Sequence, residues 1–472
     1  MEKYNYGVIG LGVMGRNLLY NIADNGFSVA GFDLDNEKVN ALHEGATSGT
    51  EVKGTASLEE FTSLLETPRK IILMVPAGAP VDAVLESITP LLSPKDIVID
   101  AGNSYFKDTE RRIAALASQN LHFMGMGVSG GEQGARRGPS IMPGGDLEAF
   151  KTVQPMLELI AAKVNGEACT AYMGKGSAGN YVKMVHNGIE YAIMQLISEA
   201  YDLLRKGANL NNEQLYEVFK KWNEGEMNSF LIEITRDIFQ QKDELTDGFL
   251  IDQILDKAGA KGTGKWTSEQ AMEIGVSIPT IDIAVTSRIL SAYKEERTEA
   301  SQLYPKNQIT APENTELFIK EVGEALYLAT LISYAQGLAL LVKASKEYQF
   351  EIPLKDVVKI WRGGCIIRSV LLEKFYSAYT QNPDLSNILL NNEISELVNS
   401  KIGSLRKTAA FAVSNGIPSL AIQSALGYFD AYTTDTLPVN LIQAQRDYFG
   451  AHTYQRTDRE GIFHTQWQNL NN

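Results

Sequence analysis

Short apolar segments alternate with helical patterns over residues 1–178 of this 472-residue chain, and this alternation restricts the possible folds more than any other feature. Strands that are separated by helices are joined by crossover connections, which leave neighbouring strands parallel. We therefore predict a mostly parallel, doubly wound α/β sheet of the Rossmann type in this part of the chain. The expected strands are Tyr6 to Ile9, Ser28 to Phe32, Lys70 to Val75, Asp96 to Asp100 and His122 to Met126.

Helical patterns dominate the rest of the chain, and they continue to about Pro438. The sequence thus predicts an α/β domain at 1–178, a large all-α domain at 179–438 and a polar, aromatic-rich C-terminal tail at 439–472. The uncharged run from Ala325 to Val342 is long enough to raise the question of a membrane span. It contains several polar residues, so we expect a buried core helix and no membrane contact.

The helical part contains an internal repeat. Gly188 with Leu196-Ile197-Ser198, Ala200 and Leu203 recurs at one constant offset as Gly323 with Leu331-Ile332-Ser333, Ala335 and Leu338. Further along, Trp222 with the segment Ser229 to Glu233 recurs as Trp361 with the segment Ser369 to Glu373. Two echoes in the same order predict two copies of one helical unit that pack together.

Composition and charge exclude several classes of protein. The formal net charge of −14 repels polyanions, so no nucleic acid partner is expected, and an anionic ligand needs a local cluster of cations. Cys169 and Cys365 cannot form a disulfide framework, and the five histidines show no metal-ligand spacing, so no metal is expected. The chain runs from Met1 to Tyr6 directly into an apolar strand with no signal pattern, so we expect a cytoplasmic protein.

A glycine-rich turn follows the first expected strand and begins a helical pattern. Its residues are Gly10, Leu11, Gly12, Val13, Met14 and Gly15. In this context the first glycine allows a tight turn, the second lets the backbone approach a pyrophosphate, and the third lets the helix pack on the strand. Glycines also mark plain turns, but the position at the first strand favours dinucleotide binding.

An acidic pair follows the second expected strand, in the order Asp33-Leu34-Asp35. A carboxylate at this place can accept hydrogen bonds from the adenosine ribose hydroxyls. A 2′-phosphate would face two carboxylates without a nearby arginine, so we expect NAD to be favoured over NADP. The alternative for Asp35 is that it only caps the following helix, which leaves Asp33 as the basis of this prediction.

A polar stripe lies on the helical pattern at the start of the second part. Lys183, His186, Asn187, Glu190 and Tyr191 have the spacing of one helix face. The alternative is a solvated surface where Lys and Glu pair.

The internal repeat provides a control for this stripe. At the positions of Lys183, His186, Asn187 and Glu190 the second copy has Phe318, Glu321, Val322 and Ala325. The fold can therefore be built without the stripe, which favours a chemical role.

Four motifs together resemble decarboxylating 6-phosphogluconate dehydrogenase, of the β-hydroxyacid dehydrogenase superfamily, and the likeness runs along essentially the whole chain. They are Lys183-Met184-Val185-His186-Asn187-Gly188-Ile189-Glu190-Tyr191, Gly127-Val128-Ser129-Gly130-Gly131, Lys261-Gly262-Thr263-Gly264-Lys265-Trp266-Thr267 and Gln445-Arg446-Asp447-Tyr448-Phe449-Gly450-Ala451-His452.

The resemblance implies oxidative decarboxylation of 6-phosphogluconate to ribulose 5-phosphate and carbon dioxide with reduction of NAD(P)+, a step of the pentose phosphate pathway. It implies that Lys183 is the general base and Glu190 the general acid. The substrate positions it implies are Asn103, Ser129, Gly130, Gly131, His186, Asn187, Tyr191, Lys261, Arg288, Arg446 and His452, of which Lys261, Arg288 and Arg446 hold the phosphate. It also implies a homodimer in which the tail with Arg446 and His452 reaches the partner's active site.

The chain departs from the family's pattern at the cofactor. The usual Asn-Arg-Thr after the second strand is replaced by Asp33-Leu34-Asp35, and a Lys often found after a later strand is absent from Val75-Pro76-Ala77. Besides the glycine-rich turn, the residues expected to contact the cofactor are Asp33, Leu34, Asp35, Val75, Pro76, Ala77 and Asn103. Both departures make the place of a 2′-phosphate more negative, which again favours NAD.

Two other functions stay open at this point. One is another dehydrogenase of the β-hydroxyacid group, although the cations Lys261, Arg288 and Arg446 argue for a phosphorylated substrate. The other is a nucleotide-sensing protein without turnover, although such a protein should have lost its acid and base. A lysine can act as a base if burial and nearby cations lower its pKa. The surroundings of Lys183 therefore determine whether it can be the general base.

Overall fold

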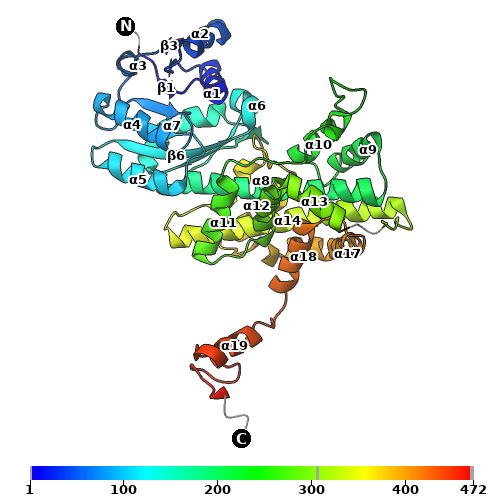
Figure 1. Cartoon of the computed structure of the whole chain (residues 1–472). Coiled ribbons are helices and arrows are strands. Elements are labelled where there is room, and N and C mark those ends of the chain that lie inside the picture. Colours follow the sequence, from blue (N-terminus) through cyan, green and yellow to red (C-terminus); the bar gives the residue numbers. More distant parts are fainter. Residues whose placement is uncertain (1–2, 305–307, 468–472) are drawn as a thin grey trace. The chain divides into compact units, whose positions relative to one another are not determined.

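The structure is a computed structural model that describes residues 3–304 and 308–467. It divides into two compact units, Met1–Ala425 and Leu426–Asn472. The first unit holds the sheet and most of the helices, and the second holds the end of the chain (Figure 1). The three domains with limits at residues 178 and 438 stay a prediction.

A seven-stranded sheet forms the core of the N-terminal part, in the order β3-β2-β1-β4-β5-β6-β7. All its neighbours are parallel except β6 and β7, which are antiparallel. The predicted mostly parallel α/β sheet is thus confirmed. The strands are β1 Tyr6–Ile9, β2 Val29–Phe32, β3 Val52–Thr55, β4 Lys70–Leu73, β5 Ile97–Asp100, β6 His122–Ser129 and β7 Ser140–Gly144.

Two strands of this sheet were not expected from the sequence. The edge strand β3 reads Val-Lys-Gly-Thr, which is short and half polar, so it lacks the apolar run of a central strand. The other, β7, contains Pro143 and glycine, residues that are depleted in strands, yet it pairs with β6 over five residue pairs.

Helices cover both faces of the sheet (Figure 1). Because side chains alternate along a strand, Val8 contributes to the apolar core on one face and the neighbouring Ile9 to the core on the other. These helices are α1 Val13–Asp24, α2 Asn36–Gly45, α3 Leu58–Leu64, α4 Ala79–Ile88, α5 Phe106–Ala117, α6 Gly131–Arg137 and α7 Leu147–Ile160. A small hairpin follows them, formed by β8 Lys163–Val164 and β9 Glu167–Ala168.

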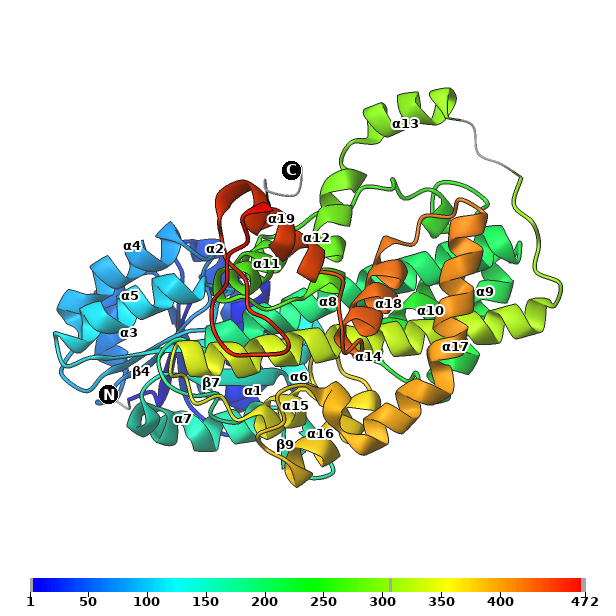
Figure 2. The same cartoon turned by 90° about the horizontal axis from the view of Figure 1, so that it is seen from below.

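The described part of the chain beyond residue 178 is helical, as predicted. Its helices are α8 Ala178–Asp202, α9 Asn212–Asn223, α10 Phe230–Gln240, α11 Thr263–Ile274, α12 Pro279–Ser291, α13 Lys294–Leu303, α14 Thr315–Glu347, α15 Leu354–Trp361, α16 Leu371–Gln381, α17 Asn392–Ser414, α18 Leu420–Tyr432 and α19 Asn440–Gly450. Helices α8 and α14 run side by side through the middle of the first unit (Figure 2).

Glycines let α8 approach its neighbours closely. A Cβ on Gly127 of β6 would lie 2.4 Å from the Lys183 Cβ, and one on Gly179 would lie 2.3 Å from the Gly125 carbonyl oxygen. On the other side, a Cβ on Gly337 of α14 would lie 2.5 Å from Ile189. Backbone approaches of this kind tolerate no side chain, so α8 is held tightly between the sheet and α14.

The two repeat copies meet about a pseudo-two-fold contact. Ser229 and Ser369, which are equivalent in the repeat, form an antiparallel bridge. The Phe230 N–H donates to the Arg368 carbonyl at 3.1 Å, and the Val370 N–H donates to the Asn228 carbonyl at 3.0 Å. Equivalent atoms of the two copies therefore make reciprocal hydrogen bonds, as expected for two copies of one unit related by a local two-fold.

Helix α14 carries the uncharged run that raised the question of a membrane. It is the one helix in the described residues that is long and apolar enough to span a bilayer, with a mean hydropathy of 1.7 over the most apolar window. That window is 83% buried inside the protein. This is the environment of a core helix, as expected.

The second unit contains more regular structure than a polar tail suggests. Helix α19 Asn440–Gly450 is followed by a loop in which Tyr454 and Phe463 pair backbone to backbone, with both N–H···O distances 2.8 Å.

Candidate functional site

The glycine-rich turn between β1 and α1 has the conformation of a phosphate cradle. Gly10 has φ +95°, and a Cβ on it would lie 2.6 Å from the Met74 carbonyl oxygen, so only glycine fits. A Cβ on Gly15 would lie 1.9 Å from the Gly10 carbonyl oxygen. By contrast, nothing lies within 4 Å of the Cβ position of Gly12, and no side chain caps α1. The open side of Gly12 and the free N–H groups of the first helical turn fit a pyrophosphate.

This turn lies at the carboxyl ends of β1 and β4, where the strand order of the sheet reverses. Open α/β sheets bind ligands at that switch point. Val13 is half exposed, Met14 is partly buried and Leu11 is buried. The turn residues predicted for the cofactor are therefore together at the expected edge, and they fit a dinucleotide.

The acidic pair after β2 is already engaged by backbone groups. Asp33 accepts hydrogen bonds from the Leu11 N–H at 2.8 Å and the Asp35 N–H at 3.0 Å. Asp35 caps α2 by accepting from the Glu37 N–H at 2.9 Å, which is the alternative role considered for it. Lys38 was overlooked in the sequence. Its Nζ lies 3.5 Å from Asp33 and 3.7 Å from Asp35, so a cation faces the pair.

The other expected cofactor contacts lie in the loops after β4 and β5. Pro76, Ala77 and Asn103 are exposed, and Val75 is partly buried. Leu34, after β2, is 83% exposed. All of them are at the carboxyl edge of the sheet, as the prediction requires.

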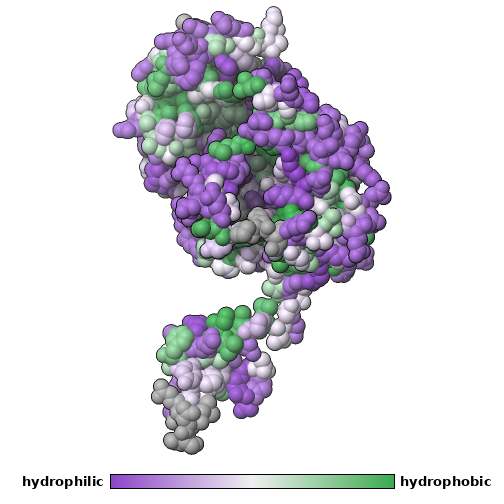
Figure 3. Space-filling view, turned by 45° about the vertical axis from the view of Figure 1, so that its right-hand side comes forward, coloured by the Kyte–Doolittle hydropathy of each residue, from purple (hydrophilic) through white to green (hydrophobic). Residues whose placement is uncertain are grey.

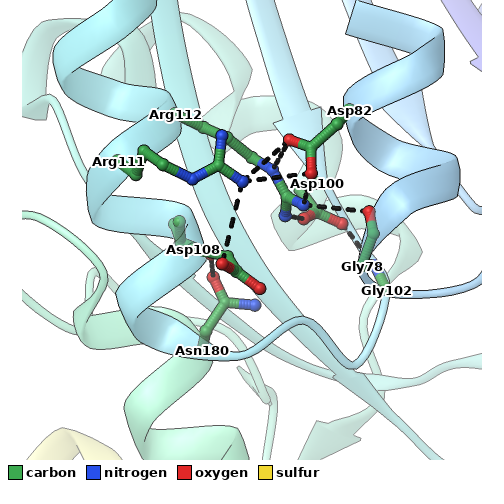
Figure 4. A network of polar contacts seen from close by, with 9 residues as sticks. Gly78, Asp82, Asp100, Gly102, Asp108, Arg111, Arg112 and Asn180 are labelled. Atoms are coloured by element: carbon green, nitrogen blue, oxygen red, sulfur yellow. Dashed lines mark hydrogen bonds and ion pairs between the residues drawn. The ribbon is translucent and has the colours of Figure 1, made fainter.

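Arg112 of α5 connects the two loops from inside the protein (Figure 4). Its guanidinium donates to the Gly78 carbonyl at 3.0 Å and to Asp82 at 2.9 and 3.1 Å, and it lies 3.5 Å from Asp100. Asp100 in turn accepts from the Gly102 N–H at 3.1 Å. Arg112 and Asp100 are both almost fully buried, so this network fixes the loops that precede Asn103 and follow Ala77.

The predicted polar stripe on α8 is buried apart from Glu190, which is partly buried, and this excludes the alternative of a solvated surface ion pair. His186 is in the middle of it: its Nδ1 lies 3.0 Å from Asn187 Oδ1 and 3.5 Å from Lys183 Nζ, and its Nε2 lies 3.2 Å from Ser129 Oγ. The amide oxygen accepts only, so we assign the ring proton to Nδ1 and let Nε2 accept from the Ser129 hydroxyl. Burial and the charge of Lys183 keep the pKa of His186 well below its usual value, so the ring is neutral.

The surroundings of Lys183 and Glu190 shift both groups toward their neutral forms. Burial lowers the pKa of the Lys183 ammonium, although Glu190 and Cys365 act in the opposite direction. Burial likewise raises the pKa of the Glu190 carboxyl, opposed by Lys183 and Arg288. Of the two effects considered for Lys183, burial is the one that lowers its pKa, whereas the neighbouring charges that act on it raise it. A lysine whose pKa is lowered and a carboxyl whose pKa is raised, on one helix face, are suited to general base and general acid catalysis.

The glycine motif after β6 lies against this face. Ser129 is buried at the end of β6 and contacts His186. Gly130 has φ +126°, and a Cβ on it would lie 2.5 Å from the Gly364 carbonyl oxygen; Gly131 has φ +62° and open space around its Cβ position. The motif thus places Ser129 beside the stripe while leaving room next to Gly131.

At the other end of the stripe, Arg288 stacks on Tyr191, with its guanidinium carbon 3.4 Å from the ring centroid. It also donates to the Gly259 carbonyl at 3.1 Å, which belongs to the loop before Lys261. A Cβ on Gly264 would lie 2.6 Å from the Tyr191 ring, so the helix that follows this loop also packs on the stripe. Lys261 itself is exposed. Arg288 thus contacts one end of the polar stripe and also holds the loop that precedes Lys261.

Arg446 and His452 belong to the second unit. Arg446 lies on α19, and His452 lies in the loop that follows this helix. Their predicted part in substrate binding stays a prediction. Within that unit, Arg446 is exposed and donates to Gln443 at 3.2 Å.

The second repeat copy uses the equivalent positions for packing. Phe318 stacks near Phe411 with ring centroids 4.5 Å apart, Glu321 pairs with Lys407 at 2.6 Å, and Val322 and Ala325 are buried. This confirms that the scaffold is built without a polar stripe in that copy.

Several residues of the site were not predicted. Trp361, at the end of α15, lies edge-on to the His186 ring with centroids 5.7 Å apart, and Cys365 is buried close enough to raise the pKa of Lys183. In the sequence, Trp361 is only a part of the repeat, and Cys365 is only one of two cysteines that cannot form a disulfide framework. Nothing in their local sequence points to α8, because the contact depends on how the second copy folds back. In the described residues, no group of three or more His, Cys, Asp and Glu side chains is arranged to hold a metal ion.

Comparison with known families covers almost the entire chain. The model of the NAD binding domain of 6-phosphogluconate dehydrogenase matches residues 5–201, and that of the 6-phosphogluconate dehydrogenase C-terminal domain matches residues 179–467.

Individual relatives agree. The chain is 53% identical over 468 residues to "6-phosphogluconate dehydrogenase, NADP(+)-dependent, decarboxylating" of Bacillus subtilis, covering 99% of this chain and 100% of the relative. It is 48% identical over 469 residues to the decarboxylating enzyme of Escherichia coli K12, with 99% and 100% covered. The 6-phosphogluconate dehydrogenase of Plasmodium falciparum, solved in its apo form, with its cofactor NADP+ and with its substrate, has a similar structure: TM-score 0.96, 45% identity, 98% and 100% covered. The chain therefore belongs to the family of decarboxylating 6-phosphogluconate dehydrogenases.

Proposed function

We propose that this protein oxidises and decarboxylates 6-phosphogluconate to ribulose 5-phosphate and carbon dioxide, with a nicotinamide dinucleotide as the oxidant. The observation that carries the proposal is the buried α8 face, where Lys183 and Glu190 are both shifted toward their neutral forms beside His186, Asn187 and Ser129. Neither a solvated helix nor a simple core helix needs such an arrangement.

Lys183, neutral before the reaction, takes the proton of the substrate 3-hydroxyl as C3 is oxidised. A nicotinamide dinucleotide, when bound, would supply the acceptor for the hydride of C3. The 3-keto acid then loses carbon dioxide, since the new carbonyl group, β to the carboxylate, accepts the electron pair of the breaking C–C bond as an enol. Lys183, now protonated, donates a hydrogen bond to the oxygen on which negative charge develops.

Glu190 completes the reaction by delivering its proton to C1 of the enediol, which gives ribulose 5-phosphate. The raised pKa of this carboxyl keeps the proton available until the carbon dioxide has left. His186, Asn187 and Ser129 orient the substrate hydroxyls and carboxylate, while Arg288 and Lys261 are placed to attract the phosphate.

The direct test is to mix the purified protein with 6-phosphogluconate and each nucleotide and to follow reduced nucleotide and carbon dioxide together. Equal amounts of both products are expected. Reduction without carbon dioxide would instead identify another β-hydroxyacid dehydrogenase. Nucleotide binding without any reduction would identify a non-catalytic sensor.

For the choice of nucleotide, we propose that NAD is favoured over NADP. The proposal is supported by the two carboxylates of Asp33 and Asp35 after β2, which would repel a 2′-phosphate, and by Lys38, which compensates only one of their two negative charges. The Bacillus subtilis relative is named as NADP(+)-dependent, and the Plasmodium structure holds NADP+, so this preference would distinguish the chain from both.

The ratio of kcat/KM for NAD to that for NADP measures the preference, and a ratio clearly below one would contradict it. Lys38→Met tests the physical reason. Removal of the cation leaves the carboxylates uncompensated, so kcat/KM should fall more for NADP than for NAD. The matched control is Lys53→Met on β3, which is outside the acidic pair.

We further propose a homodimer in which the C-terminal tail reaches the partner's active site. Exposed apolar residues of the second unit support it, since large apolar areas on a soluble protein usually mark contact surfaces (Figure 3). They are Leu437, Val439, Leu441, Ile442, Tyr448, Phe449 and Ile462. The first unit has a similar group on α12, on α13 and in the short connection between them, namely Ile289, Leu290, Tyr293 and Leu303. A dimer should sediment at twice the 51.9 kDa of one chain.

A cytoplasmic location is our proposal as well. It rests on the two cysteines, Cys169 and Cys365, which are both free and buried, as suits a reducing compartment. Cell fractionation tests it, and recovery of the protein in a membrane or secreted fraction would contradict it.

A further inference from the structure

The loop around His452 has an unusual backbone. Ala451 and Thr453, on either side of His452, have φ angles of +49° and +60°. Ala451 ends α19, and a left-handed residue is common at such a place. Thr453 is different, because a β-branched residue with a positive φ is a genuine outlier that the surrounding structure must hold in place.

Asp447 holds this backbone from α19. Its carboxylate is fully buried and accepts from the Thr453 N–H at 2.9 Å and from the His464 Nδ1 at 2.9 Å. Its other oxygen accepts from the Thr465 N–H at 3.0 Å and from the Trp467 Nε1 at 2.8 Å. One side chain therefore joins the start of the loop, at Thr453, to its end, at Thr465 and Trp467.

Gln443, one helical turn before Asp447, adds a second hold on the same residue. Its side chain donates to the Thr453 carbonyl and accepts from Arg446 at 3.2 Å. Thr453 thus has both its backbone groups bound to side chains of α19. Since Gln443 also contacts Arg446, the guanidinium and the His452 loop are parts of one network.

His452 itself is confined by its neighbours. Its ring lies above Gly450, where a Cβ would come within 2.7 Å of His452 Nε2, and it meets the Phe449 ring edge-on at 6.0 Å between centroids. The direction of the imidazole therefore depends on the backbone at residues 450–453, which Asp447 and Gln443 hold.

We propose that Asp447 is a positioning residue for the phosphorylated substrate, which holds the strained loop so that His452 and Arg446 are presented together. This rests on the proposed function of the tail in substrate binding. Asp447 does not touch the substrate. A buried carboxylate is needed because an amide at this place offers only one accepting oxygen to four donors.

The test compares Asp447→Asn with Asp458→Asn in the full-length enzyme. Asp458 lies in the same unit but pairs at the surface with Arg456 and Arg459, so it is the matched control. For Asp447→Asn we expect the KM for 6-phosphogluconate to rise about tenfold, with kcat and the KM for the nucleotide changed by no more than about twofold. Asp458→Asn should leave all three unchanged.

A second variant separates positioning from general damage to the tail. A glycine at position 453 can adopt a positive φ without strain. The double variant Asp447→Asn/Thr453→Gly should therefore have a lower KM for 6-phosphogluconate than Asp447→Asn alone. Failure of the double variant to improve on Asp447→Asn would overturn the proposal, as would an unchanged KM in Asp447→Asn itself.

Arg446→Ala distinguishes this inference from the function on which it rests. If Arg446→Ala raises the KM for 6-phosphogluconate and Asp447→Asn does not, the tail binds substrate and the positioning role is wrong. If Arg446→Ala leaves that KM unchanged, the role of the tail in binding is wrong, and the positioning role falls with it.

Discussion

At the scale of single residues, the site combines two buried ionisable groups that disfavour their own charge. Such groups cost folding stability in exchange for reactivity, since the buried positions would be more stable with neutral side chains. These groups are Lys183 and Glu190. Substitution of either residue is expected to change the folding stability as well as the reaction rate.

Lys183→Met should abolish turnover yet raise stability. The pKa of Lys183 is lowered in the folded protein, so the unfolded chain binds more protons between that pKa and the usual value of 10.5. Wild-type stability therefore rises with pH through this window, and at neutral pH the lysine destabilises the fold. We expect the variant to gain about 1 kcal/mol at pH 7 in urea unfolding. Lys343→Met, half exposed on α14, is the control, and a loss of stability in Lys183→Met beyond that control would contradict the assignment.

Glu190→Gln has the opposite dependence on pH. The pKa of Glu190 is raised in the fold, so the folded protein binds more protons than the unfolded chain above the usual value of 4.5. Wild-type stability then falls as pH rises through that window, whereas the neutral Gln is unaffected. The difference in melting temperature between variant and wild type should therefore grow with pH. Glu347→Gln at the exposed end of α14 should show no such trend. The Glu190 variant should also accumulate the enediol, because Gln cannot protonate C1.

At the scale of secondary structure elements, the position of α8 depends on what its neighbours lack. Glycines in β6, α11 and α14 allow backbones and side chains to approach where any Cβ would collide. The position of this one helix thus depends on glycines in one strand and two other helices.

Gly127→Ala tests this dependence. The new Cβ would lie 2.4 Å from the Lys183 Cβ, so strand and helix must separate. We expect kcat to fall by about tenfold or more and stability by about 1–3 kcal/mol, with nucleotide binding retained. Gly403→Ala on α17 is the control, because nothing lies within 4 Å of its Cβ position and Ala favours a helix. Wild-type kcat in Gly127→Ala would show that the close approach does not position Lys183.

Arg112→Met tests the network that joins the loops after β4 and β5. The substitution keeps much of the volume but leaves the buried Asp100 without its cation, which should cost about 3 kcal/mol of folding stability. The loops that carry Ala77 and Asn103 lose their connection, so the Kd for the nucleotide should rise, as measured by protein fluorescence. Arg111→Met, whose guanidinium is more than half exposed, should change neither quantity substantially.

At the scale of the whole molecule, the proposed tail exchange makes the active site a property of two chains. Mixing two inactive variants can test it, because each variant can contribute what the other lacks. Lys183→Met removes the base from its own α8, and Arg446→Ala removes the tail cation.

Mixed dimers of Lys183→Met and Arg446→Ala should regain activity at low substrate concentration. If the tail acts on the partner, one site of each mixed dimer has both defects and the other has none. Random mixing should then restore about a quarter of the wild-type activity, since half of the dimers are mixed. If the tail acts within its own chain, every site keeps one defect and no activity returns. Dimer formation is checked by sedimentation in parallel.

Much of this protein is determined by local sequence. The periodicity of apolar residues predicts the central strands and the helical second part, since burial on one face imposes a period of two or of 3.6 on any chain. The glycine turn after β1 and the acidic residue after β2 can be predicted from the sequence because each has a role that depends on its position directly after a strand. The i, i+3, i+4, i+7 spacing of the α8 stripe, with its absent counterpart in the second copy, predicts where the chemistry takes place before any neighbouring residue is known.

The tertiary structure decided everything that depends on residues distant in the chain. Burial, which no local pattern reports, shifts the pKa of Lys183 and of Glu190, and a repeat copy folding back brings Trp361 and Cys365 to the stripe. Strand β3 lacks an apolar run and β7 contains Pro143 and glycine, and both form because a neighbouring strand satisfies their backbone. Nothing in the local sequence singles out Lys38 or Asp447. Lys38 matters because it lies close to two carboxylates, and Asp447 matters because four donors bind its carboxylate oxygens. These contacts are set by packing, which brings together segments that are separate in the sequence.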